Sequence, residues 1–201
     1  MSSNSNLSSA ETLSSKPKKT IYLIRHAETE ENVRIQHLKN VGSSILRIRP
    51  PKPSDVYYGC QFLGMVSTGH TNSLLSENGK HQIEEMHSQL LQNSFTSKIE
   101  KIAHSPLTRA METCYGIFDF SSSSSSSSSL SLQTNVVALE SLRELTPFET
   151  VICGKRPVEN RIKELCHWLD EQEEETIALV GHSQYFKHML DLKELFKNCD
   201  V

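Results

Sequence analysis

The sequence predicts an α/β fold, a three-layer α/β/α arrangement around a central, mostly parallel sheet, and two observations indicate it. Four short runs rich in apolar and β-branched residues have the length and composition of buried parallel strands. Segments with helical spacing of apolar residues separate these runs, as in βαβ units. The four predicted strands cover residues 20–25, 101–104, 135–139 and 176–180.

Three segments between or after these strands carry the start signals of helices. Ser76 is the predicted N-cap of the first helix, Ser105 before Pro106 that of the second, and Pro157 opens the third. Each segment has apolar residues at helical spacing, which we expect in the core. These residues are Ile83, Met86 and Leu90 in the first, Leu107, Met111, Cys114 and Phe118 in the second, and Val158, Ile162, Leu165 and Leu169 in the third.

The chain of 201 residues has room for one hydrophobic core. Residues 1–18 are Ser-rich and predict a disordered tail, which leaves one domain over 19–201. Two insertions interrupt this domain. Residues 33–75 hold several glycines and prolines and predict an irregular excursion after the first strand, and 121–131 begins with nine serines and predicts a disordered surface segment.

Charge and cysteine usage exclude several classes of protein. The net charge of −3 gives no whole-molecule basis for binding nucleic acid or an anionic membrane, so we expect neither partner, and any anion site must be local. The five cysteines are odd in number and contain no C-x-x-C pair, which indicates neither a disulfide framework nor a zinc site. The first residues lack the apolar core of a signal peptide, and we expect a cytoplasmic protein without metal or other cofactor.

Polar residues with phosphate chemistry follow each predicted strand. The first strand ends in Arg25-His26, the second leads to Arg109, the third to Glu144 and the fourth to His182. Ligands of open parallel sheets bind at the carboxyl ends of the strands, so we expect these side chains to converge. Neutral imidazole can attack phosphorus, arginine binds phosphate oxygens with forked donors, and a carboxylic acid can protonate a leaving oxygen. The pattern therefore predicts phosphoryl transfer.

The motifs around these residues resemble those of the histidine phosphatase, or phosphoglycerate mutase-like, superfamily. Residues 25–32 (RHAETEEN) resemble its R-H-[GA]-E-[ST]-x-x-N signature, 105–110 (SPLTRA) its S-P-L-x-R-A helix start, 142–144 (LRE) its acid segment, and 181–183 (GHS) its second-histidine turn. The resemblance spans about residues 20–195 and makes 19–201 a histidine phosphatase domain. It implies a phosphohistidine enzyme with His26 as nucleophile, Glu144 as proton donor, and a phosphate pocket of Arg25, Asn32, Arg109 and His182.

The departures from the family pattern bear on the reaction. The family's D-x-P-L-T element appears only as 72–76 (NSLLS), and the segment after Glu144 lacks the E-R-H-Y-G pattern of glycolytic mutases. This favours a metal-independent phosphatase acting on a phosphorylated small molecule or a phosphoprotein. Two alternatives stay open, a phosphoglycerate-type mutase and a non-catalytic protein that binds phosphorylated ligands on the same fold. Oligomeric state and substrate identity are not indicated.

Three further hypotheses concern individual residues. Gly181-His182-Ser183 also resembles a serine nucleophile elbow, but too few residues follow Ser183 to supply its partners, so we expect it to cap a helix. Among the acids after the third strand we expect Glu144, rather than Glu140 or Glu149, to be the proton donor. The excursion at 33–75 is predicted to form part of a lid that recognises anionic substrate through its cations, namely Arg34, Lys39, Arg47, Arg49 and Lys52.

Overall fold

One parallel β-sheet organises the protein in the computed structural model, which describes residues 18–67, 72–93, 95–118, 135–144, 146 and 156–190. The strands have the order β1-β4-β2-β3, and every pairing between neighbours is parallel. The predicted α/β fold with a parallel sheet is therefore confirmed. The strands are β1 (Thr20–Arg25), β2 (Lys101–His104), β3 (Val136–Ala138) and β4 (Thr176–Gly181).

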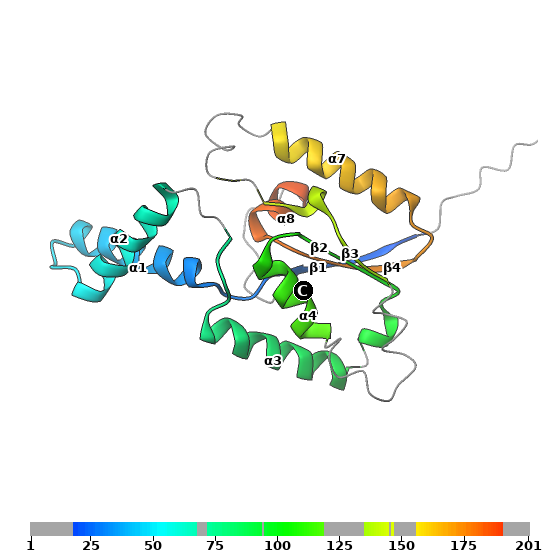
Figure 1. The fold of residues 1–201 in the computed structure, drawn as a ribbon, viewed down its shortest axis with the longest axis horizontal. Helices are drawn as coiled ribbons and strands as arrows, with labels where there is room; N and C mark the ends of the chain where they lie inside the picture. Colours follow the sequence, from blue (N-terminus) through cyan, green and yellow to red (C-terminus); the bar gives the residue numbers. More distant parts are fainter. Residues whose placement is uncertain are drawn as a thin grey trace, which may run out of the picture.

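Helices cover both faces of this sheet and give the three expected layers (Figure 1). Side chains of successive strand residues point to opposite faces, so a strand between two helical layers is apolar throughout. In β4, Ala178 and Val180 pack with one helical layer, whereas Ile177 and Leu179 pack with the other. The helices of the first layer are α3 (Glu77–Gln92) and α4 (Thr108–Phe118), and those of the second are α7 (Arg156–Glu171) and α8 (Ser183–Leu190).

The helix starts follow the sequence in part. Ser76 caps α3 by accepting a hydrogen bond from the Gly79 amide, as predicted. The prediction that Ser105 caps the second helix is wrong, because α4 begins at Thr108 and its first amide donates to the side chain of Asn72 at 2.9 Å. An N-cap supplied by a distant loop leaves no local signal in the sequence. Of the expected apolar stripe in α4, Cys114 and Phe118 are buried, but Met111 is 38% exposed.

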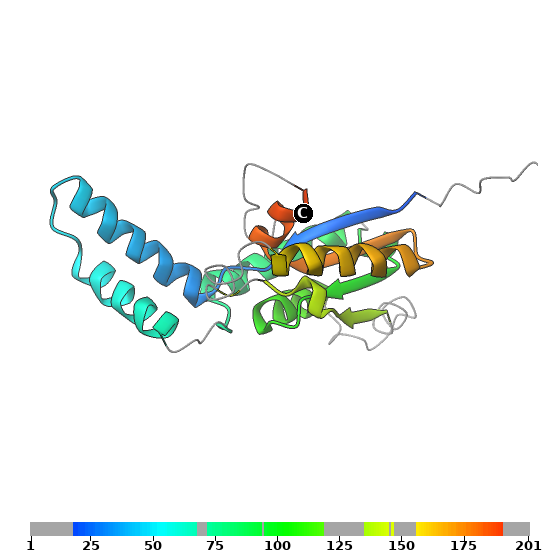
Figure 2. The same cartoon turned by 90° about the horizontal axis from the view of Figure 1, so that it is seen from above.

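The segment 33–75 is not an irregular excursion, because it contains most of two helices, α1 (Glu30–Leu46) and α2 (Pro53–Ser67). Thr29 and Asn32 form a reciprocal capping box at the start of α1, and a proline at the first position suits the start of α2. Glycines and prolines obscured both helices in the sequence. The helices pack against each other as a hairpin that projects from the sheet (Figure 2).

Short helical turns complete the described fold, η1 (Thr96–Lys98) before β2 and η2 (Glu140–Leu142) after β3. The predicted tail up to residue 17 and the serine run lie outside the described residues, as do Leu145 and Glu149. Among the helices of the described part, none combines the length and apolar character needed to cross a membrane.

Candidate active site

The carboxyl ends of the strands open into a pocket of about 360 Å³, within the range of about 300–1,000 Å³ that is typical of small-molecule sites. Five of the six predicted site residues line it, and the sixth, His182, lies directly behind them. The loops after β1, β3 and β4 and the start of α4 contribute, as the topology predicts. The lining residues are Arg25, His26, Thr29, Glu31, Asn32, Ile35, Lys39, Leu107, Arg109, Arg143, Glu144, Thr146, Ser183 and Gln184.

His26 follows β1 and has one ring nitrogen fixed by the backbone. Its amide donates to the Gly181 carbonyl at 2.9 Å, and its Nδ1 lies 2.7 Å from the Ala27 carbonyl oxygen. A carbonyl can only accept, so Nδ1 carries the proton and Nε2 keeps its lone pair. Burial, helped by the positive charges of Arg109 and Arg25, lowers the pKa of His26 from 6.5 to about 3. The imidazole is therefore neutral near pH 7, with a nucleophilic Nε2.

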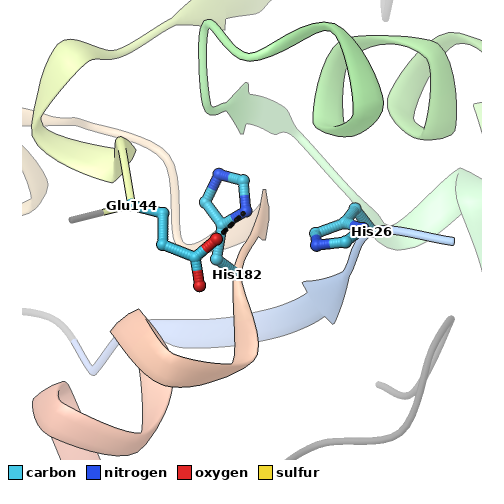
Figure 3. A group of neighbouring side chains, drawn as sticks. All are labelled: His26, Glu144 and His182. Carbon is cyan, nitrogen blue, oxygen red and sulfur yellow. Dashed lines mark ion pairs between the residues drawn. The ribbon is translucent and has the colours of Figure 1, made fainter. Parts of the chain in front are cut away.

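His182 follows β4, and its ring centroid lies 5.1 Å from that of His26 (Figure 3). Its Nε2 is 2.8 Å from the hydroxyl of Ser105, which also accepts a weak hydrogen bond from the Leu107 amide. We assign the hydroxyl proton to the bond with His182 Nε2, which places the imidazole proton on Nδ1. Burial holds the pKa of His182 well below its usual value, so a neutral ring presents an N–H donor.

Glu144 extends from the loop after η2, and its Oε2 lies 3.4 Å from His182 Nδ1 (Figure 3). This contact is too poorly aligned to count as a hydrogen bond, since Nδ1 has no hydrogen-bond partner. The same oxygen accepts a hydrogen bond of 2.9 Å from Arg109 Nη2. Burial raises the pKa of Glu144 against the opposing effect of Arg109, and the charge of Glu31 adds to the rise. A raised pKa suits a carboxyl that must donate a proton.

Arg109 and Asn32 are held by their helices at the pocket. Arg109 is the second residue of α4 and is 5% exposed, so its guanidinium and the helix N-terminus both favour an anion there. In α1, Asn32 Oδ1 accepts from the amide and hydroxyl of Thr29, which directs its Nδ2 donors elsewhere. Thr113 fixes the loop after His26, because its hydroxyl accepts a 3.0 Å hydrogen bond from the Ala27 amide.

Glu28 belongs to the sequence motif but does not line this pocket. Its carboxylate accepts a 2.7 Å hydrogen bond from Ser76, and its carbonyl accepts from the Ser76 amide. The Glu28 backbone runs so close to α3 that a Cβ on Gly79 would collide with the Glu28 carbonyl oxygen. Glu28 therefore ties the nucleophile loop to α3 and does not itself line the pocket.

The structure distinguishes Glu144 from Glu140 as candidates for the proton donor. The side chain of Glu140 is 75% exposed and lies 3.6 Å from Arg143, whereas that of Glu144 is in the pocket.

Ser183 is the first residue of α8 and lines the pocket, and His182 precedes the helix.

The ligand atoms of His26, Glu144 and His182 all lie within 4.8 Å of one another, close enough to be considered for a metal ion. The charges around them do not fit a cation. The positive charges of Arg25 and Arg109 act on both histidines, and Arg109 already binds Glu144. A pocket with two fixed guanidinium groups favours an anion instead.

Sequence reasoning missed Ser105 and Glu31 as residues of this site. Ser105 was expected to cap α4 but contacts His182 instead, and Glu31 lines the pocket from α1. Lys39, which also lines the pocket, was predicted only as one of the lid cations. The position of Glu31, one residue before the predicted ligand Asn32, is a signal that could have found it. Of the other predicted lid cations, Arg47, Arg49 and Lys52 stand at the opposite end of the hairpin, about 25 Å along α1 from its start.

Comparisons with solved structures bear on the fold. No family model and no curated protein matches the sequence. A protein from Escherichia coli described as an alpha-ribazole-5′-P phosphatase aligns in structure over 87% of this chain and 78% of its own, with a TM-score of 0.54 and 18% identity. This chain has the histidine phosphatase fold. YhfR from Bacillus stearothermophilus matches over 85% and 77%, with a TM-score of 0.51 and 18% identity.

Proposed function

We propose that this chain is a histidine phosphatase, which hydrolyses a phosphomonoester through a phosphohistidine on His26. The observation that carries the proposal is the hydrogen bond from His26 Nδ1 to the Ala27 carbonyl, which leaves Nε2 unprotonated in a pocket lined by Arg25 and Arg109. A nucleophile activated by its tautomer and flanked by two guanidinium groups suits attack on a phosphate dianion. The fold of the structural matches supports the same reading.

In the first step the lone pair of His26 Nε2 attacks phosphorus. Arg25, Arg109, Asn32 and His182 Nδ1 donate to the phosphoryl oxygens as negative charge spreads over them in the transition state. The bond from phosphorus to the leaving oxygen breaks, and its electron pair goes to that oxygen. Glu144 delivers its proton to the oxygen, so that an alcohol leaves and a carboxylate remains.

In the second step water attacks the phosphohistidine. The carboxylate of Glu144 takes a proton from the water, the new oxygen–phosphorus bond forms, and the electron pair of the phosphorus–nitrogen bond returns to Nε2. Inorganic phosphate leaves, and His26 and Glu144 regain their starting protonation. Ser105 keeps the donor nitrogen of His182 turned to the pocket throughout both steps.

The test is to incubate the full chain with small phosphometabolites, phosphopeptides and an aryl phosphate, and to measure the inorganic phosphate and the alcohol that are released. A phosphatase releases inorganic phosphate in proportion to alcohol. A mutase instead returns the phosphoryl group to an alcohol and yields an isomeric ester with little free phosphate. Binding of phosphorylated ligands without turnover or label on His26 would overturn the proposal in favour of a binding protein.

The proposed chemistry needs no metal, since the charges of Arg25 and Arg109 fill the role that a cation has in other phosphatases. We therefore expect full activity after prolonged incubation with a strong chelator. The measurement is kcat/KM before and after chelation, with readdition of Zn²⁺, Mg²⁺ or Mn²⁺. Activity lost to the chelator and restored by one of these ions would contradict the charge argument and give the three-residue cluster a metal role.

A further inference from the structure

The turn between α1 and α2 exposes an unusual set of apolar side chains. We call residues 45–52 the hairpin tip. Within it Ile45 is 64%, Leu46 86% and Ile48 95% exposed, and Ile48 is the most exposed large apolar side chain among the described residues. Three aliphatic side chains close together in water are unfavourable for a free protein surface.

Ile48 also has a backbone conformation that disfavours isoleucine. Its φ is 53°, and no other described residue apart from glycines has a positive φ. The Ile48 amide donates to the Ile45 carbonyl and the Arg49 amide to the Ser44 carbonyl, which is the hydrogen-bond pattern of a Schellman motif with Ile48 at the position that normally holds glycine. A β-branched residue is strained there, and local strain at an exposed position is a reason to look for function.

Cations flank these apolar side chains, and the acid nearest to them in the sequence is Asp55. Arg47, Arg49 and Lys52 are all exposed, and the sequence contains no Asp or Glu between Glu31 and Asp55. The side chain of Asp55 is buried and lies 2.6 Å from His37, and its charge also interacts with that of Lys52. Arg47 and Arg49 are therefore the cations on which the charge of the tip mainly depends. The tip is therefore a local patch of positive charge on a chain whose net charge is −3.

The hairpin holds this patch away from the rest of the molecule. The strongest contacts of α1 and α2 are with each other, and Figure 2 shows the pair extending from the sheet with the tip at its far end. The 17 residues of α1 give the arm a length of about 25 Å. A surface that approaches the tip would meet it before the body of the protein.

We propose that the hairpin tip is a docking element for an anionic lipid bilayer, with Ile45, Leu46 and Ile48 inserted among the lipids at the interface. Arg47, Arg49 and Lys52 pair with the anionic headgroups around them. Exposed apolar side chains flanked by exposed cations match the two properties of such an interface, its apolar interior and its negative surface. A second copy of this chain is a poorer occupant, because two tips brought together would oppose cation to cation. The expectation of no membrane partner rested on net charge, which averages away this local patch.

The test is co-sedimentation of the full chain with vesicles of phosphatidylcholine alone or mixed with phosphatidylserine. We expect binding to the mixed vesicles, weakened at high salt, and little binding to phosphatidylcholine alone. Reversing Arg47 and Arg49 to Glu should reduce binding on the order of tenfold or more. The matched control reverses two exposed cations elsewhere, Lys98→Glu with Lys163→Glu, and should keep most of the binding.

Ile48→Gly separates the insertion from folding. Glycine suits the positive φ, so this variant should be at least as stable to heat as the parent yet bind vesicles several-fold more weakly. Leu91→Gln, which changes an exposed leucine on α3, should bind like the parent. Equal binding of the parent, Ile48→Gly and the Arg47/Arg49 variant would overturn the proposal. Absence of binding to the mixed vesicles would also overturn it, and so would dimerisation of the chain through the tip instead of binding to vesicles.

Discussion

Arg109 Nη2 donates a 2.9 Å hydrogen bond to Glu144 Oε2, so the arginine proposed to bind phosphate is paired with the proposed proton donor. A bound phosphate dianion would compete for the same guanidinium. When Arg109 turns its donors to the phosphate, Glu144 loses the positive charge that favours its ionised form. We therefore expect substrate binding to favour the protonated form of Glu144, because it draws away the guanidinium that opposes the effect of burial on the Glu144 pKa.

Glu144→Gln should remove general acid catalysis while leaving the phosphate site in place. We expect hydrolysis of an alkyl phosphate to slow by on the order of 10²–10⁴, because a poor leaving group needs the proton. Formation of phosphohistidine from an aryl phosphate should change little, since a phenolate leaves unaided. Single-turnover kinetics with both substrates measure the difference.

Glu140→Gln is the matched control for this variant, because the Glu140 side chain is 75% exposed and does not line the pocket. Its kinetics should equal those of the parent with either substrate. A selective loss with Glu140→Gln and none with Glu144→Gln would transfer the acid role to Glu140, while the phosphohistidine mechanism would stand.

His26→Ala should abolish turnover and the phosphoryl label, because it removes the atom that accepts phosphorus. His182→Ala should still form the label, but more slowly, since it removes only an N–H donor to the phosphoryl oxygens. The measurement is transfer of ³²P to the protein under alkaline conditions, where phosphohistidine survives. A label that persists in the His26 variant would assign the nucleophile to another residue.

The pH profile of kcat/KM should differ from the profile expected for a catalytic histidine with the usual pKa. His26 must be neutral to attack, and its pKa of about 3 means that it loses a proton well below pH 6.5, so the acid limb due to His26 lies near pH 3. Glu144 must be protonated, so activity falls as the pH rises through its raised pKa. After correction for the titration of the substrate phosphate, an acid limb centred near pH 6.5 would count against this assignment.

Lys39 is the predicted lid cation that lines the pocket, and it also lines an adjoining hollow of about 660 Å³ next to α1. Lys39→Met should raise KM for a substrate with a second anionic group severalfold, and leave KM for an aryl phosphate nearly unchanged. Arg47, Arg49 and Lys52 replaced together by Gln should change neither value, because they stand at the hairpin tip. A larger effect from the triple variant would favour the hypothesis that Arg47, Arg49 and Lys52 recognise the substrate as part of a lid.

The apolar composition of the strands, and the helical segments between them, determined much of the fold in advance. β1 and β2 have the predicted bounds, β4 extends one residue further to Gly181, and β3 is shorter than expected. These elements are predictable because a strand buried between two helical layers needs apolar side chains on both faces, and such a run is visible in the sequence. The site residues were predictable for a related reason, since the carboxyl ends of parallel strands share one edge of the sheet.

The prediction of irregular chain was wrong for the helices α1 and α2. Gly42, Gly59 and three prolines around residues 50–53 are the signals of irregular chain, and no residue of α1 is buried against the core. Such a helix is stabilised by its partner helix and by its capping box rather than by an apolar face on the sheet. Tertiary pairing overrode the local signals.

The sequence by itself determined which chemical groups meet at the sheet edge, because strand order along the chain and residue type suffice for that. Only the tertiary structure decided how they are protonated and paired. The Ala27 carbonyl selects the tautomer of His26, Ser105 that of His182, and Arg109 holds Glu144. These contacts depend on distances of a few ångströms between loops far apart in sequence, and a hydrogen bond is too short-ranged and directional to be set by residue spacing alone.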